Sequence, residues 1–156
     1  KRLGTDRIDR YQIHWPSRSV PLADTIGVAV PAQVTQLVTA VRQAVAPIPV
    51  RVHFHDTRGT GVANVWAAVE AGATMVDSSI GGLGGCPFAP GAAGNVATED
   101  VHYLFSRSGI ATTRDTADLA ATSYWLSGHL GKLMPTRAGK APAFPPSIEK
   151  VSDNDC

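Results

Sequence analysis

Two histidines separated by one residue are the first feature of this sequence that could do chemistry. The run "VRVHFHDTRGTG", residues 50–61, places His53 and His55 at the end of an apolar segment, directly before Asp56. In a β-strand, side chains two positions apart lie on the same face, so the two imidazoles would lie side by side. Imidazoles placed in this way suit a divalent metal ion. A buried strand with two hydrogen-bonded histidines fits the same stretch, and on these residues alone both interpretations stay open.

A glycine-rich stretch around a single thiol is the second such feature. Residues 81–95, "GGLGGCPFAPGAAGN", hold six glycines, two prolines and Cys86. Glycines allow positive φ angles and close approach of the backbone to a ligand, and a thiol in such a loop can act as an acid, a base or a nucleophile. The alternative is a surface loop with an incidental cysteine. The loop lacks GxxxxGK[ST] and is not a phosphate-binding loop.

Short β-branched runs alternate with helical patterns along the chain, and these elements must position the two features. We expect strands over residues 7–15, 49–54 and 74–80, and a short apolar segment that ends at Asp24. The helices expected begin at Pro31, stop at Gly72 after a stripe over 62–69, run from about 98 to 108, and extend from the N-cap Asp115 to Gly128. This alternation is typical of right-handed βαβ units with a parallel sheet. Such sheets carry their chemistry at the carboxyl ends of the strands, and the polar residues expected there are Asp24, His53, His55, Asp56, Asp77 and Ser78.

Composition excludes several classes of function. The 156 residues normally form one domain, and 44% hydrophobic with 17% charged residues is typical of a globular protein. A net charge of +1 gives no argument for nucleic acid or for an anionic membrane surface, so we expect neither as a partner. No apolar run is long enough to span a membrane, and the basic start lacks the apolar core of a signal peptide. Two cysteines, Cys86 and Cys156, make no disulfide framework, which favours a reducing cytoplasm.

Several motifs together carry a resemblance to a known family. "LADTIGVAVP", "VHFHDTRGTG", "VDSSIGGLGGCPFAPGAAGNVATED" and "LSGHLGK" closely resemble the carboxyl-terminal part of 3-hydroxy-3-methylglutaryl-CoA lyases. These are TIM-barrel metallolyases related to isopropylmalate and homocitrate synthases. The resemblance covers about residues 20–132 without an evident gap, and "GGLGGCPF" is the loop that separates the lyases from the synthases.

The resemblance implies a set of site residues. His53 and His55 become metal ligands, with Asn95 as a further ligand, and the implied cofactor is a divalent cation, Mg²⁺ or Mn²⁺. Because two imidazoles are softer ligands than Mg²⁺ prefers, we expect Mn²⁺ to bind more tightly. Cys86 becomes the catalytic thiol on a mobile loop, and Asp24 falls on an active-site carboxylate of the family.

The implied reaction is a metal-assisted retro-Claisen cleavage of an acyl-CoA substrate, 3-hydroxy-3-methylglutaryl-CoA, to acetyl-CoA and acetoacetate. A base removes the proton of the 3-hydroxyl, the carbon–carbon bond breaks, and the enolate of acetyl-CoA takes a proton. Cys86 is the candidate donor of that proton, directly or through a water.

The fold class expected is α/β: a partial (β/α)₈ TIM barrel with about the last three βα units and one foreign strand at its amino end. Residues 1–18 resemble a strand of aldo-keto reductases, in which His14 matches the active-site histidine. Residues 19–134 form the metallolyase part, and residues 135–156 are expected to be loose. The family's first barrel strand, with its arginine and metal-binding aspartate, has no counterpart in this sequence. An open barrel exposes strand edges, so we expect a homo-oligomer.

Three other functions remain as alternatives. The chain could be a synthase that condenses an acyl-CoA with a 2-oxo acid, although the cysteine loop argues against this. It could be an inactive or chimeric barrel fragment. It could also be an aldo-keto reductase, although the other catalytic residues of that family are absent.

Overall fold

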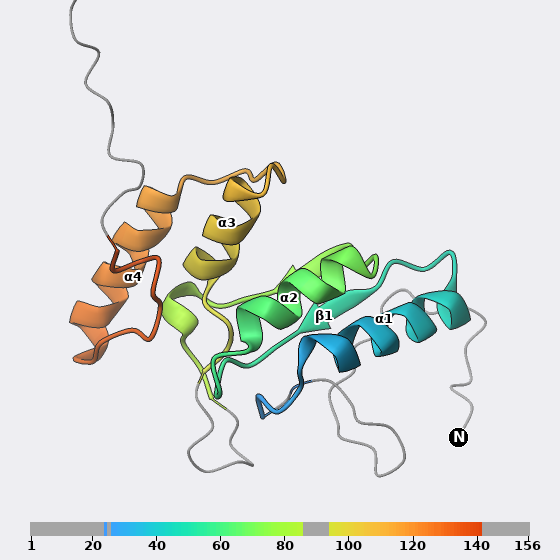
Figure 1. The fold of residues 1–156 in the computed structure, drawn as a ribbon. Helices are drawn as coiled ribbons and strands as arrows, with labels where there is room; N and C mark the ends of the chain where they lie inside the picture. The colour runs from blue at the N-terminus through green and yellow to red at the C-terminus, as the bar shows by residue number, and fades with distance from the viewer. Residues whose placement is uncertain (1–23, 25, 86–93, 142–156) are drawn as a thin grey trace, which may run out of the picture.

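The computed structural model describes residue 24, residues 26–85 and residues 94–141. Figure 1 shows the order of the elements. They are α1 (Pro31–Val45), β1 (Arg51–His53), α2 (Gly61–Glu70), β2 (Met75–Asp77), the 3₁₀-helix η1 (Ile80–Gly82), α3 (Thr98–Arg107) and α4 (Thr116–Leu130). Among these residues no helix is both long and apolar enough to cross a lipid bilayer.

The two strands are parallel neighbours, as the βαβ pattern predicts. Arg51 lies opposite Met75, and His53 lies opposite Asp77. A third extended segment, residues 95–97, joins the ends of both strands through one bridge to His55 and another to Ser79. The two strands and α2 between them form a βαβ unit, as expected for a partial barrel. Of the expected third segment, which ends at Asp24, only Asp24 itself is among the described residues.

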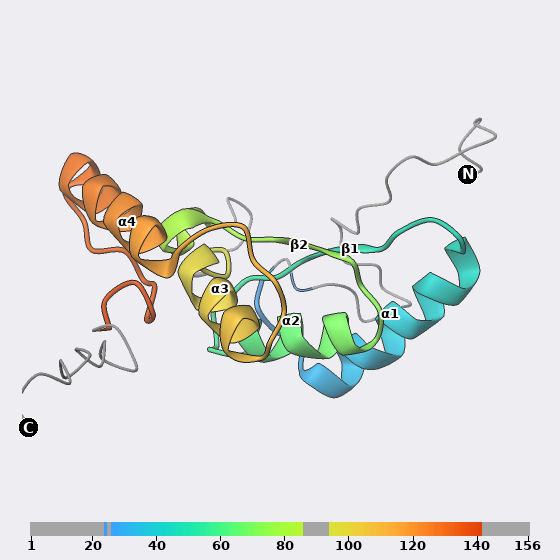
Figure 2. The ribbon, with the colours of Figure 1, turned by 90° about the horizontal axis from the view of Figure 1, so that it is seen from above.

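The strands present two unlike faces because apolar and polar residues alternate along them. Val52 and Phe54 are buried, and Figure 2 shows α1 and α2 covering this side of the strands. Arg51 and His53 point to the opposite side, where they stay half-buried. The helices thus cover one face of the sheet and leave the polar face to the site.

The core lies between the sheet and its helices. Val34 and Val38, one turn apart on α1, are both buried, while Val65 and Ala68 on α2 have no exposed surface. These positions follow the helical spacing of the apolar residues. Full burial of a valine side chain contributes about 1.5 kcal/mol or more relative to leaving it exposed.

Two helix ends show which local signals decide a boundary. Asp115 is the N-cap of α4, as expected, and its carboxylate accepts a hydrogen bond from the Ala117 amide at 2.8 Å. The helix runs past Gly128 and ends at Gly131, which has a φ of 63°. The helix is therefore longer than expected. Gly128 lies within it, and the helix ends only at Gly131, where the backbone is left-handed.

Residues 134–141 form a segment that we call the clasp, and it is packed rather than loose. Met134 and Thr136 are 3% and 1% exposed, and the Thr136 amide donates to the Gly81 carbonyl at 3.1 Å. The expectation of a loose chain beyond Pro135 was wrong for these residues. Its composition resembles that of a linker, but its backbone finds hydrogen-bond partners on η1 and α3.

Several of the sequence-based expectations fall outside the described residues. These are the strand over residues 7–15 with His14, the apolar segment before Asp24, Cys86, and the tail over residues 142–156 with Cys156.

Candidate functional site

The histidine pair lies where β1 ends. Its ring centroids are 5.2 Å apart, with an angle of 61° between the ring planes. His53 is the last residue of β1 and is half-buried, and His55 is 7% exposed. The structure therefore brings the two imidazoles together on one side of the sheet, as the spacing of two predicted.

Asn95 lies beside this pair. It forms an antiparallel bridge with His55, and its Nδ2 donates to the Leu83 carbonyl at 3.0 Å. This bond directs the other end of the amide, the oxygen, away from Leu83. Gly84, with a φ of 118°, passes so close that a Cβ there would lie 2.6 Å from Asn95 Nδ2. A glycine is therefore required where the loop passes the amide.

The donor types of these residues fit a divalent cation. Two adjacent imidazole nitrogens and an amide oxygen are common ligands of first-row transition metals. Within the part of the chain that the structure describes, no three His, Cys, Asp or Glu residues gather closely enough to hold an ion. The fit rests on the two histidines and Asn95, and the described residues add no carboxylate to them.

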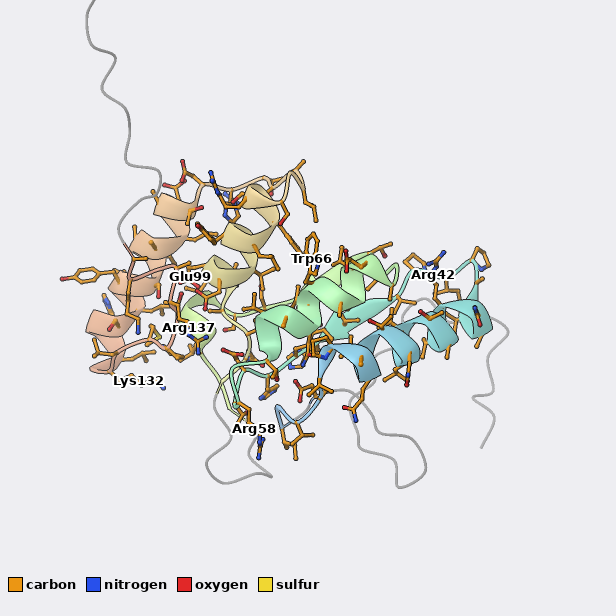
Figure 3. The ribbon with its side chains drawn as sticks, viewed as in Figure 1. Arg42, Arg58, Trp66, Glu99, Lys132 and Arg137 are labelled. Carbon is orange, nitrogen blue, oxygen red and sulfur yellow. The ribbon has the colours of Figure 1, made fainter. Side chains whose placement is uncertain are left out.

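Asp56, which follows His55 directly, closes the turn into α2. Its Oδ1 accepts from the Gly61 amide at 2.7 Å, and its Oδ2 accepts from Arg137 Nη1 at 2.8 Å. Acceptance of an amide at the start of a helix favours a negative charge there. Hydrogen bonding and charge attraction from Asp56 raise the pKa of Arg137 above its ordinary value. Figure 3 shows Arg137 and Arg58 on the side where α2 begins.

Asp77 and Ser78, expected at the end of the next strand, contact neighbours of their own. Asp77 forms an ion pair with Arg51 across the two strands, with Nε donating to Oδ1 at 2.6 Å. This contact raises the pKa of the Arg51 guanidinium. The Ser78 hydroxyl lies 2.9 Å from that of Thr98. Both residues lie near the strand ends, but their side chains contact neighbouring side chains that hold the fold together.

Asp24 is completely buried, with 0% of its surface exposed. Its carboxylate accepts hydrogen bonds from the amides of Val28 and Ala29 and from Asn64 Nδ2. Its carbonyl accepts from the His55 amide at 3.3 Å. The carboxylate thus shapes the turn before α1 and is closed to solvent. A direct role in chemistry stays a prediction.

Glu99 is a residue that the sequence did not single out. It has no exposed surface, and both carboxylate oxygens lie 2.9 Å from the Gly81 amide, which donates to them. It therefore holds the turn from which the glycine loop departs, and Figure 3 places its label beside that of Arg137. The available signal was an acidic residue in the first turn of a helix that follows the loop directly.

Comparison with known proteins places this geometry in a family. The family model named HMGL-like matches residues 14–125. The chain belongs to this HMGL-like family. The supposed aldo-keto reductase strand over residues 1–18 is not supported, because the family model already takes in residues 14–18.

Relatives of this HMGL-like chain are acyl-CoA lyases. It is 46% identical over 125 residues to the (R)-citramalyl-CoA lyase of Chloroflexus aurantiacus, covering 80% of this chain and 39% of that protein. It is 44% identical over 116 residues to a hydroxymethylglutaryl-CoA lyase of Bacillus subtilis, covering 74% of this chain and 39% of the relative.

A solved structure of a lyase is also similar to this chain. The HMG-CoA lyase of Acinetobacter baumannii, in complex with coenzyme A and 3-methylmalate, superposes with a TM-score of 0.74 at 46% identity, covering 79% of this chain and 40% of that one. The chain spans about 40% of the length of these three relatives.

Proposed function

We propose that this chain supplies the metal-binding strand end and the glycine loop of a carbon–carbon lyase that cleaves 3-hydroxy-3-methylglutaryl-CoA to acetyl-CoA and acetoacetate. The observation that carries the proposal is the adjacent pair His53 and His55, bridged to Asn95 at the base of the glycine loop. Membership of a family with hydroxymethylglutaryl-CoA lyases supports the reaction. A low cysteine count supports a cytoplasmic location.

His53, His55 and Asn95 would hold a divalent cation, Mg²⁺ or Mn²⁺. Such a cation, when bound, polarises oxygen atoms of the substrate as a Lewis acid. The residues of the chain orient the ligands and connect them to the glycine loop. The bridge between His55 and Asn95 orients the ligands, and the bond from Asn95 to Leu83 ties the glycine loop to them.

Proton transfer completes the proposed reaction. A general base takes the proton of the 3-hydroxyl, and the bond between C2 and C3 breaks, which gives acetoacetate and the enolate of acetyl-CoA. Cys86, which lies outside the described residues, is proposed to donate a proton to C2 of that enolate. The overall cleavage neither adds nor removes atoms.

A second substrate is supported by the relative at 46% identity, a citramalyl-CoA lyase. Citramalyl-CoA has the same tertiary 3-hydroxyl next to a thioester arm, and its cleavage gives acetyl-CoA and pyruvate. The two substrates differ by one methylene before the carboxylate. The same strand end therefore serves either reaction, and the product identifies the acyl group.

Metal binding is the first test. We expect the chain to bind Mn²⁺ with micromolar affinity in calorimetry and the variant His53→Ala to lose this binding, because one of two imidazole ligands is removed. His129→Ala is the matched control, since His129 is an exposed histidine on α4. Binding that is absent, or that His53→Ala leaves unchanged, contradicts the proposed metal site.

An activity assay follows. The metal-loaded chain is incubated with each of the two thioesters, and acetoacetate or pyruvate is measured. Release of either product that depends on both Mn²⁺ and His53 supports the proposed reaction. Metal binding without turnover would leave this chain as a binding fragment of the lyase.

A further inference from the structure

The backbone of the clasp, residues 134–141, is anchored independently of its arginine side chain. Asp100 Oδ1 accepts hydrogen bonds from the amides of Arg137 and Ala138 at 2.9 and 2.7 Å and from the Thr136 hydroxyl at 2.9 Å. The Thr136 amide donates to Gly81. The first turn of α3 and the turn η1 thus fix the point from which the Arg137 side chain starts.

From that point the Arg137 guanidinium reaches Asp56, which is 81 positions away in the sequence. The second oxygen of the same carboxylate accepts from the Gly61 amide. Gly61 allows this close approach, because a Cβ there would lie 2.8 Å from Asp56 Oδ1. Asp56 is therefore held at both oxygens, and it is bonded in the chain directly to His55.

The exposure of this ion pair argues against a role in stability. The Arg137 side chain is 69% exposed, while that of Asp56 is 16% exposed. Ion pairs with such an exposed partner contribute little to folding, because water screens the charges and a long side chain loses its freedom. The effect of the ion pair is local. It fixes the turn over residues 56–61, immediately after the histidine pair.

We propose that Arg137 is a positioning residue: it fixes the carboxylate of Asp56, and through it the turn that holds His55 in place for a divalent cation. The link to the cation rests on the proposed function. Removal of a group that hydrogen-bonds to a metal ligand changes metal affinity by about 10- to 100-fold. Arg137 acts one residue further away, through Asp56, so we expect an effect at the low end of that range. The clasp thereby ties the carboxyl-terminal part of the described chain to the proposed metal site.

The experiment compares Arg137→Ala with Arg137→Lys and with the control Lys140→Ala. Lys140 is an exposed cation on the same clasp, so its removal changes the net charge equally. Three quantities are measured for each protein: hydrogen exchange of the amides over residues 55–61, Mn²⁺ affinity by calorimetry, and the midpoint of thermal unfolding.

We expect Arg137→Ala to speed exchange of the Gly61 amide and to weaken Mn²⁺ binding about tenfold, with little change in the unfolding midpoint. The sign of the change in affinity is informative. Removal of a nearby positive charge should by electrostatics alone tighten binding of a cation, whereas loss of positioning weakens it. Arg137→Lys should restore part of the affinity, and Lys140→Ala should change neither exchange nor affinity.

Unchanged exchange at Gly61 in Arg137→Ala overturns the proposal, as does Mn²⁺ affinity that rises, stays constant or falls equally in Lys140→Ala. If the unaltered chain binds no Mn²⁺, the proposed function fails. In that case the exchange at Gly61 still decides whether Arg137 holds the turn.

Discussion

At the scale of single residues, burial separates carboxylates that shape the fold from those that are open to a ligand. Asp24 and Glu99 are both completely buried, and each accepts backbone amides. A buried carboxylate is tolerated only where such partners satisfy it. Asp24 therefore holds the turn before α1 in shape, and Glu99 holds the turn η1.

Asp24 gives a prediction that distinguishes structure from chemistry. Asp24→Ala leaves the Val28 and Ala29 amides without their acceptor and removes one of the two acceptors of Asn64 Nδ2, so we expect the free energy of unfolding to fall by about 3 kcal/mol. Asp24→Asn keeps one oxygen and should lose less. Urea unfolding measures both. Full stability together with lost lyase activity in Asp24→Ala would instead show that the carboxylate acts on the substrate.

At the scale of elements, the turn η1 depends on a residue with no side chain. Gly81 has a φ of 65°, and a Cβ there would lie 2.6 Å from the Met134 side chain of the clasp. The amide of the same residue donates to Glu99. The absence of a side chain at Gly81 therefore allows the glycine loop, α3 and the clasp to pack against one another.

Two glycine substitutions should therefore have opposite effects. We expect Gly81→Ala to lower the free energy of unfolding by about 2 kcal/mol, because it combines a left-handed backbone with a close contact. Gly128→Ala, within α4, meets nothing within 4 Å and should stabilise the chain by up to about 1 kcal/mol. Thermal unfolding compares the two. Equal effects of the two variants would contradict the packing of the clasp on η1.

At the scale of the whole molecule, the described part of the chain leaves apolar side chains uncovered. On α4 and just after it, Tyr124, Trp125 and Leu133 are 83%, 57% and 85% exposed. Figure 1 shows α4 beyond α3, at the end of the molecule away from α1. Exposed apolar side chains of this size favour contact with another protein surface.

We therefore expect the chain to self-associate at micromolar concentration, measured by light scattering. Tyr124→Ser together with Leu133→Ser should lower the average mass, because exposed apolar area is removed. Lys132→Ala, at an exposed neighbouring position, is the control. A monomeric mass for the unaltered chain would contradict the expected homo-oligomer.

Local signals in the sequence determined the positions of the elements and of the histidine pair. The alternation of residue types along β1 placed His53 and His55 on one face, and Pro31 and Asp115 marked the starts of two helices. These properties depend on residues that are close together in the chain. The motifs around them were also sufficient to indicate the family.

Only the tertiary structure decided which polar side chains form hydrogen bonds and ion pairs within the fold. Three contacts join residues that are 18 to 81 positions apart in the chain: Asp24 with Asn64, Glu99 with Gly81, and Arg137 with Asp56. A sequence shows a carboxylate or a cation but not its partner, because that partner is set by how the helices pack on the sheet. The clasp was misjudged for this reason: its order comes from backbone hydrogen bonds to distant residues, which composition does not record.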